Sequence, residues 1–256
     1  MEKPESYWRE VYLNYAMTSG YKKRIEQARD NYRAMLDMGL RYQVNVSGGK
    51  DSLCLWHLAN SIEPCVAVNY VDDMLDEHAD VYANLKQVSE AHGMSIRYIR
   101  DELNIWALAE AAGKLTTDIR GEIERDDIRR MAESQKREGV ECLVLGMRAE
   151  ESKGRRINYA LRGPLYFNKG FDYWVSQPLA HMKAKDVLAY LFEHQVSLPE
   201  VYFKTKFYNS PEMIRVDWLL PLESKDHIQY AWLAHYYPGI WDRLCRINPL
   251  FKTYVS

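Results

Sequence analysis

The sequence of 256 residues lacks the features that would assign it to several specialised classes. It contains no run of about 18 apolar residues, which a membrane-spanning helix needs. Its first residues, MEKPESYWRE, lack the apolar stretch of a secretory signal. Neither sign of charge is in large excess, because 34 Lys and Arg stand against 36 Asp and Glu for a net charge of −2. We therefore expect a soluble, cytoplasmic protein with no membrane association. The net charge does not indicate nucleic-acid binding, although it does not exclude a local basic patch that binds nucleic acid.

Cysteine is scarce, and its spacing excludes the common metal motifs. The four cysteines are Cys54, Cys65, Cys142 and Cys245, and none forms a C-x-x-C pair. The first three lie in apolar segments, where a reduced thiol behaves as a small hydrophobic side chain. No His and Cys group has zinc spacing, so we expect neither zinc nor an Fe–S cluster.

What is present is the pattern of an α/β domain. Hydrophobic residues make up 47% of the chain and charged residues 27%, the balance of a globular protein. Short apolar runs alternate with segments of helical periodicity, which predicts a Rossmann-like open parallel sheet with helices on both faces. The expected strands are 42–46, 65–71, 95–100, 141–146 and 173–175. One expected helix begins at residue 51, and four others cover residues 76–92, 103–113, 121–138 and 185–194.

Three parts of the chain differ in pattern. Residues 1–38 predict a helical extension with a break at Gly20 and a stop at Gly39. Residues 39–205 predict the α/β domain, and 206–256 predict a helical, aromatic segment packed on the same domain as a helix pair that covers the sheet. The extension could serve a protein partner or a homo-oligomer, and its residues do not decide between them.

A six-residue loop, Ser47-Gly48-Gly49-Lys50-Asp51-Ser52, follows the first expected strand and precedes a helix. Two glycines allow the backbone to approach an anion, and amides at a helix N-terminus attract phosphate. Lys50 adds a point charge, which we expect to be exposed, and the two serines add hydroxyl donors. Asp51 could orient a magnesium ion or cap the helix. The G-x-x-x-x-G-K-[ST] spacing of a Walker A loop is missing.

A second motif, Gly146-Met147-Arg148-Ala149-Glu150-Glu151-Ser152-Lys153-Gly154-Arg155, follows the strand at 141–146. Guanidinium groups bind phosphate or sulfate in a bidentate manner, so Arg148 and Arg155 could clamp an anionic ligand. The alternative is a solvated basic turn balanced by Glu150 and Glu151. Placement after a strand favours the clamp, and we then expect Arg148 to be replaceable without a large loss of stability.

These two motifs resemble the PP-loop ATP pyrophosphatase superfamily, in particular its phosphoadenosine phosphosulfate (PAPS) reductase-like family. A weaker third block, with Pro178-Leu179, Asp186-Val187, Leu198-Pro199 and Tyr202, extends the resemblance over about 41–205. The sequence departs from the family at Asp73, where the family usually has Thr, and at Met182, where it often has Trp.

The resemblance implies an adenine nucleotide alpha hydrolase-like fold that binds ATP and Mg²⁺. It implies catalytic roles for Lys50, Asp51 and Arg148, with Asp51 as a magnesium ligand. The implied nucleotide-binding residues are Ser47, Gly48, Gly49, Lys50, Asp51, Ser52, Asp72, Gly146, Arg148, Glu151, Ser152 and Arg155. Asp72 could shape the adenosine site, or it could stabilise the first turn of the following helix.

Three functions follow as hypotheses. The first is an ATP pyrophosphatase that adenylylates an acceptor and releases pyrophosphate, as in the sulfate adenylyltransferase small subunit or DNA phosphorothioation branch. The acceptor stays open among sulfate, a nucleobase carbonyl and a partner-bound sulfur relay. The second is a reductase of PAPS or adenosine 5′-phosphosulfate, which is disfavoured because Cys245 lacks the family's E-C-G-x-x-H segment. The third is a nucleotide-binding subunit without turnover.

Two further features carry weaker hypotheses. His181 is the best placed of seven histidines, none of which has metal-binding spacing. Residues 158–174 interleave aromatic side chains with Arg162 and Lys169, a pattern that could stack single-stranded bases, form a lid or simply pack.

Overall fold

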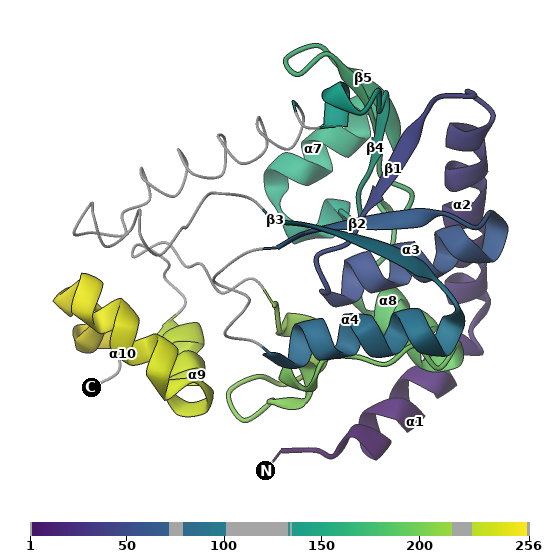
Figure 1. Cartoon of the computed structure of the whole chain (residues 1–256). Helices are drawn as coiled ribbons and strands as arrows, with labels where there is room; N and C mark the ends of the chain where they lie inside the picture. Colours follow the sequence, from purple (N-terminus) through teal and green to yellow (C-terminus); the bar gives the residue numbers. More distant parts are fainter. Residues whose placement is uncertain (1, 72–78, 101–132, 134, 217–226, 255–256) are drawn as a thin grey trace.

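The computed structural model describes residues 2–71, 79–100, 133, 135–216 and 227–254 (Figure 1). The expected helix at 103–113, most of that at 121–138, and Asp72 with Asp73 lie outside the described residues.

The described chain is built on a six-stranded sheet in the order β3-β2-β1-β4-β6-β5. Neighbouring strands are parallel except β5, which runs antiparallel to β6 at one edge. The strands are β1 (Tyr42–Asn45), β2 (Val66–Val71), β3 (Ser95–Arg100), β4 (Cys142–Val144), β5 (Leu165–Asn168) and β6 (Tyr173–Ser176). The predicted open, mostly parallel α/β sheet is therefore confirmed.

Strand β5 was not predicted, because its four residues do not stand out from their aromatic and basic surroundings. Leu165 pairs with Ser176 and Asn168 with Tyr173, so β5 and β6 form a hairpin. An edge strand is paired on one side only, so it does not need the continuous apolar sequence of a buried parallel strand.

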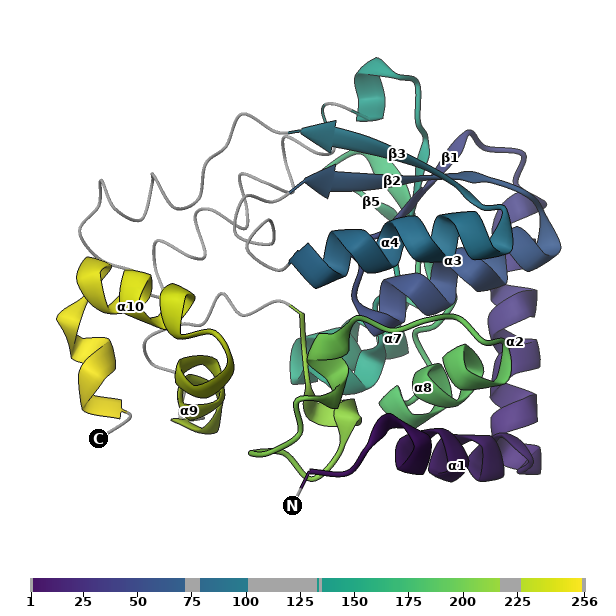
Figure 2. The same cartoon turned by 60° about the horizontal axis from the view of Figure 1, so that its bottom comes forward.

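Two helices cover one face of the sheet, α3 (Lys50–Ile62) and α4 (Ala79–His92) (Figure 2). They connect consecutive parallel strands in one direction, and right-handed crossovers place such helices on the same face. Helix α8 (Ala184–Glu193) packs on α3, and α1 (Glu5–Ala16) packs on α8. No helix in the described ranges has the length and hydropathy needed to cross a bilayer.

The N-terminal helices α1 and α2 (Ser19–Leu36) share the main hydrophobic core with α3 and α8. Helix α2 begins at Ser19, where the Thr18 hydroxyl accepts a hydrogen bond from the Tyr21 amide at 3.4 Å. The expected break at Gly20 is therefore wrong: a side-chain cap sets the boundary, and Gly20 lies in the first turn of α2. Gly39 adopts φ +65° in the turn after α2 and ends this helical segment, as expected.

A buried carboxylate joins these helices to α8. Asp186 is fully buried and receives two hydrogen bonds from the Arg24 guanidinium, at 2.7 and 2.8 Å. The Tyr15 hydroxyl donates to the same carboxylate at 2.9 Å. The extension is thus held by a charged network as well as by apolar packing, and removing one partner would leave a buried charge.

The C-terminal helices α9 (His227–Tyr236) and α10 (Pro238–Ile247), with the short helix η4 (Pro249–Tyr254), are helical as predicted. Their buried side chains belong to a second hydrophobic cluster with Val201 and Tyr202 of the short helix η2 (Glu200–Phe203). The pair therefore packs against the loops beyond α8 and lies away from the strands (Figure 1). The expectation that it covers the sheet is wrong.

Three histidine rings meet, those of His57 within α3, His92 at the end of α4 and His194 just after α8. The His57 ring lies 4.9 Å from that of His92 and 5.2 Å from that of His194, and its Nδ1 lies 2.9 Å from the Tyr190 hydroxyl. Burial, followed by the charges of His194 and His92, lowers the pKa of His57 to about 4. The folded protein therefore resists the proton that the unfolded chain accepts near pH 6.5.

We expect the free energy of unfolding to fall as the pH drops from 6.5 toward 4, because the unfolded chain binds more protons in that window. Since one pKa unit corresponds to about 1.4 kcal/mol and His57 is only partly shielded, the loss at pH 5 should be about 1–2 kcal/mol. Urea unfolding of the wild type and of His57→Gln at pH 7 and pH 5 measures it. Equal pH dependence of the two proteins would contradict this role of His57.

Candidate functional site

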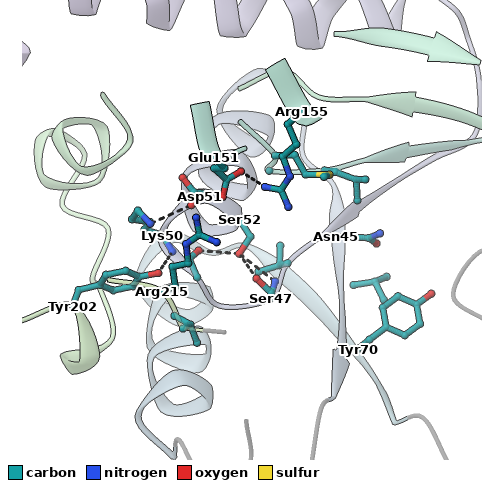
Figure 3. Close-up of a pocket in the computed structure, with 17 residues that line it drawn as sticks. Asn45, Ser47, Lys50, Asp51, Ser52, Tyr70, Glu151, Arg155, Tyr202 and Arg215 are labelled. Carbon is teal, nitrogen blue, oxygen red and sulfur yellow. Dashed lines mark hydrogen bonds and ion pairs between the residues drawn. The ribbon is translucent and has the colours of Figure 1, made fainter. Parts of the chain in front are cut away.

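A cavity of about 390 Å³ opens at the carboxyl ends of β1, β2 and β4. The order in which the chain adds strands reverses here, because β2 and β3 lie on one side of β1 and β4 lies on the other. Open α/β sheets bind their ligands at such a switch point, and the volume is within the range of small-molecule sites. Asn45 and Ser47 follow β1, Tyr70 belongs to β2, and Gly146 follows β4 (Figure 3).

The loop at 47–52 forms one wall of this cavity. Gly48 has φ +81°, and a Cβ there would lie 2.5 Å from Val81 Cγ1, so only glycine fits. The Ser52 hydroxyl donates to the Gly49 carbonyl at 2.9 Å and accepts from the Ser47 amide at 3.1 Å. Its contact with the Ser47 hydroxyl, 3.2 Å, joins the two ends of the loop. The loop is therefore held in a curled shape before any ligand binds.

Helix α3 begins at Lys50, with Gly49 as its N-cap. Helix geometry leaves the first backbone amides of α3 without intrahelical acceptors, and the helix dipole favours negative charge at this end. The Lys50 amide has an acceptor outside the helix, because it donates a hydrogen bond to the Tyr202 hydroxyl at 2.8 Å. Tyr202, in the weak third block of the sequence, therefore closes one side of the loop.

Lys50 lines the cavity, but the expectation that it is exposed is wrong, since only 3% of the residue is accessible to solvent. Its ammonium lies 3.3 Å from the Ile214 carbonyl, 3.4 Å from the Asp51 carboxylate and over the Tyr202 ring. Ile214 and Tyr202 are remote from Lys50 in sequence, so the loop motif alone does not reveal these two contacts. Burial lowers the pKa of Lys50, and Asp51 opposes that shift.

Arg148 lies behind the loop. It is only 4% exposed, and its Nε donates to Asp51 at 2.5 Å while another nitrogen donates to Glu150. Glu150 also accepts the Ala184 amide at the start of α8, at 2.5 Å. Burial works against the charge of this guanidinium, but the carboxylates win and the pKa of Arg148 is raised. The geometry favours a residue that fixes Asp51 over a clamp that faces a ligand.

The pairing of Asp51 bears on magnesium. One carboxylate oxygen lies 2.5 Å from Arg148 and the other 3.4 Å from the Lys50 ammonium. A magnesium ligand needs a carboxylate oxygen free to face the metal. Each oxygen therefore has one cationic neighbour, and a magnesium ion at Asp51, which lines the cavity, would share the carboxylate with Arg148 or Lys50. In the described part of the chain, no three His, Cys, Asp or Glu side chains form a metal-binding group.

The rest of the second motif builds the opposite wall. Glu151 and Arg155 line the cavity and form an ion pair, and Glu151 also accepts the Arg148 amide at 2.9 Å. Ser152 caps helix α7 (Lys153–Arg162), accepting from the Arg155 amide at 3.1 Å, and does not line the cavity. A Cβ on Gly146 would lie 2.9 Å from the Asp51 backbone, so Gly146 allows β4 to approach α3 closely.

Several cavity residues were not predicted from the sequence, among them the polar side chains Asn45, Tyr70 and Arg215. Arg215 follows the short helix η3 (Pro211–Met213), and its side chain reaches toward the loop (Figure 3). It is exposed and forms no hydrogen bond or ion pair with the residues that the structure describes. A lone arginine outside any motif carries no sequence signal, and only the fold brings it to the loop.

Two other candidates lie elsewhere. His181 Nε2 is 2.8 Å from the Arg24 carbonyl, and burial lowers the pKa of this ring, which suits a structural histidine. Cys245 is buried in the second hydrophobic cluster, on α10. All four cysteines lie in the described residues, and none lines the cavity.

An open, mostly parallel sheet with a glycine-rich loop and a cavity at its switch point defines a nucleotide-binding α/β domain. The profile of the phosphoadenosine phosphosulfate reductase domain matches residues 41–252, so the chain belongs to this family. The match confirms the resemblance at the level of the family. No curated protein matches the sequence.

Solved structures share the fold at low identity. PAPS reductase from Candida auris, in a phosphate complex, has a TM-score of 0.50 at 12% identity over 78% of this chain and 91% of that one. The U34-tRNA thiolase from Methanococcus maripaludis, with its 4Fe-4S cluster, has a TM-score of 0.52 at 16% identity over 90% and 80%. FMN adenylyltransferase from Candida glabrata has 0.53 at 16% identity over 76% and 64%. These relatives support the fold alone.

Proposed function

We propose that the protein is an ATP pyrophosphatase that binds ATP through the loop at 47–52 and transfers its adenylyl group to an acceptor. The observation that carries this proposal is the loop itself, which is intact, curled by its serines and open to a cavity that contains no cysteine. Three cations, Lys50, Arg155 and Arg215, line the same cavity, as a triphosphate requires.

In the proposed reaction, the loop amides and Lys50 hold the β- and γ-phosphates, with magnesium entering as part of the substrate. An acceptor oxygen attacks the α-phosphorus, a new phosphorus–oxygen bond forms, and the bond to the bridging oxygen breaks. Pyrophosphate then leaves with the electron pair of that bond. Binding in the curled loop positions the phosphates, and the cations stabilise the negative charge, so no nucleophilic side chain is needed.

Sulfonucleotide reduction is the alternative, and the geometry does not favour it. Such a reaction needs a reactive thiolate at the bound nucleotide. Cys245 is the only cysteine late in the chain, and burial raises the pKa of its thiol. A nucleotide-binding subunit without turnover is the remaining alternative.

The proposal is tested by following pyrophosphate release and transfer of labelled adenylyl from ATP and Mg²⁺, with sulfate or an oligonucleotide as acceptor. We expect pyrophosphate release that depends on one acceptor class and is lost in Lys50→Met. Tight ATP binding without release under every acceptor would instead support the non-catalytic alternative.

Arg215→Ala should weaken ATP binding about tenfold while leaving the melting temperature within about 2 °C of the wild type. The guanidinium is exposed, so its removal breaks no hydrogen bond or ion pair with the described residues, whereas one charge-assisted bond to phosphate is worth about 1.5–3 kcal/mol. Calorimetric titration with ATP and Mg²⁺ measures the effect. Arg246→Ala on α10 is the matched control, and equal affinities of the two variants would remove Arg215 from the site.

A further inference from the structure

Helix α7, whose Arg155 lines the cavity, and the β5–β6 hairpin that follows it carry five cations. These are Lys153, Arg155, Arg156, Arg162 and Lys169, and we call the surface that carries them the basic face. Arg155 pairs with Glu151, whereas the other four form no ion pair with the residues that the structure describes. A chain of net charge −2 thus carries a strongly positive local surface, which its overall charge conceals.

The charges on α7 conflict with the local electrostatics of the helix. Lys153, Arg155 and Arg156 occupy its first turns, where the helix dipole disfavours positive charge, and the helix contains no acidic residue. Three described carboxylates near α7 in sequence are already paired: Glu151 with Arg155, Glu150 with Arg148, and Asp172 with Lys136. Lys153 and Arg156 thus stay without an ion pair to the described residues at an unfavourable helix end, which is typical of a surface that serves an external ligand.

Aromatic side chains lie among these cations. Phe167 on β5 is 41% exposed and meets the Trp174 ring edge to face at 5.6 Å. The Arg162 guanidinium lies over the Tyr166 ring at 5.3 Å. Cations with aromatic platforms match the phosphates and bases of single-stranded nucleic acid. Ile157 and Leu161 are also exposed, by 50% and 78%, and add apolar surface that bases can cover.

The basic face is continuous with the cavity. Arg155 belongs to both, because it lies in the first turn of α7 and lines the cavity opposite the loop. A strand lying on α7 would therefore pass Arg155, whose side chain lines the cavity (Figure 3), close to where the α-phosphorus of ATP is proposed to face an acceptor.

We propose that the basic face docks single-stranded nucleic acid and that this strand carries the acceptor group. The inference rests on the proposed function for the acceptor role, but the docking is a property of the surface alone. Phosphates contact the unpaired cations, and bases stack on the exposed rings. The matching partner is an anionic chain with planar groups, which distinguishes it from sulfate and from an acidic peptide.

The test measures the binding of fluorescein-labelled single-stranded DNA and RNA of about 20 nucleotides by anisotropy, between about 50 and 200 mM salt. Arg156→Glu/Arg162→Glu reverses two charges of the basic face outside the cavity. Lys22→Glu/Lys23→Glu reverses two exposed charges on α2 and is the matched control. We expect at least a tenfold loss of affinity and a shallower salt dependence in the first variant only.

Three outcomes would overturn the docking: no binding by the wild type, equal losses in both variants, or equal competition by polyglutamate or anionic vesicles. The acceptor role is measured separately, as stimulation of pyrophosphate release by the bound oligonucleotide. ATP affinity should be the same in both double variants. Oligonucleotide binding without ATP binding would refute the proposed function and leave the docking intact, whereas ATP turnover without oligonucleotide binding would refute the docking.

Discussion

Arg148→Ala is expected to lower the free energy of unfolding by about 3 kcal/mol. The guanidinium is 4% exposed and joins Asp51 of the loop to Glu150, which in turn binds the first turn of α8. Removing one partner of a buried ion pair costs about 3–5 kcal/mol, and the lower end applies here because both carboxylates keep some contact with water. Urea unfolding at pH 7 measures the change. The effect expected from the sequence alone, with little loss of stability, assumed an arginine that faces a ligand.

Arg156→Ala is the control for this prediction, because it removes the same side chain from an exposed position of α7. It should change stability by less than about 0.5 kcal/mol. Arg148→Lys should recover part of the loss, since lysine keeps the charge but cannot bridge two carboxylates with one planar group. Equal stability of the two alanine variants would show that Arg148 does not hold the loop.

Lys50→Met is expected to weaken ATP binding by about 10- to 100-fold, which corresponds to about 1.4–2.7 kcal/mol. The ammonium lies in the cavity wall beside the first turn of α3, where low solvent access strengthens its attraction for phosphate. Methionine keeps an unbranched apolar side chain at this buried position while removing the ammonium over the Tyr202 ring, and Arg148 still neutralises Asp51. The fold should therefore survive, with a melting temperature within a few degrees of the wild type.

Calorimetric titration of ATP and Mg²⁺ into wild type, Lys50→Met and Lys23→Met measures this effect. Lys23 is an exposed lysine on α2, so its replacement controls for the loss of one charge. An affinity of Lys50→Met equal to that of Lys23→Met would mean that the loop does not bind the triphosphate.

The sequence predicted those parts of the fold that have a strong local signal. The run from Cys65 to Val71 is apolar nearly throughout and becomes β2, and Ser95–Arg100 becomes β3 with the expected bounds. The weak signals failed. Strand β5 is four residues long and lies at an edge, and the boundary near Gly20 depends on the side-chain cap of Thr18. The C-terminal helices had the expected periodicity, but periodicity does not say which surface they cover.

The candidate site was likewise predictable where a local motif marks it and not where contacts remote in sequence shape it. The loop at 47–52 and the residues after β4 meet at the switch point, as expected of motifs that follow neighbouring parallel strands. The burial of Lys50 depends on Tyr202 and on the Ile214 carbonyl, which tertiary packing brings to the loop. Arg215 reaches the cavity for the same reason. A motif thus identifies the loop, whereas the partners that tune its charges are set by contacts remote in sequence.

The central claim is that this cavity binds ATP through its β- and γ-phosphates. The most direct measurement is calorimetric binding of ATP with Mg²⁺, PAPS and adenosine 5′-phosphosulfate side by side, with pyrophosphate as competitor. We expect ATP to bind most tightly and pyrophosphate to displace it. Preferential binding of a sulfonucleotide that pyrophosphate does not displace would contradict ATP binding through the loop.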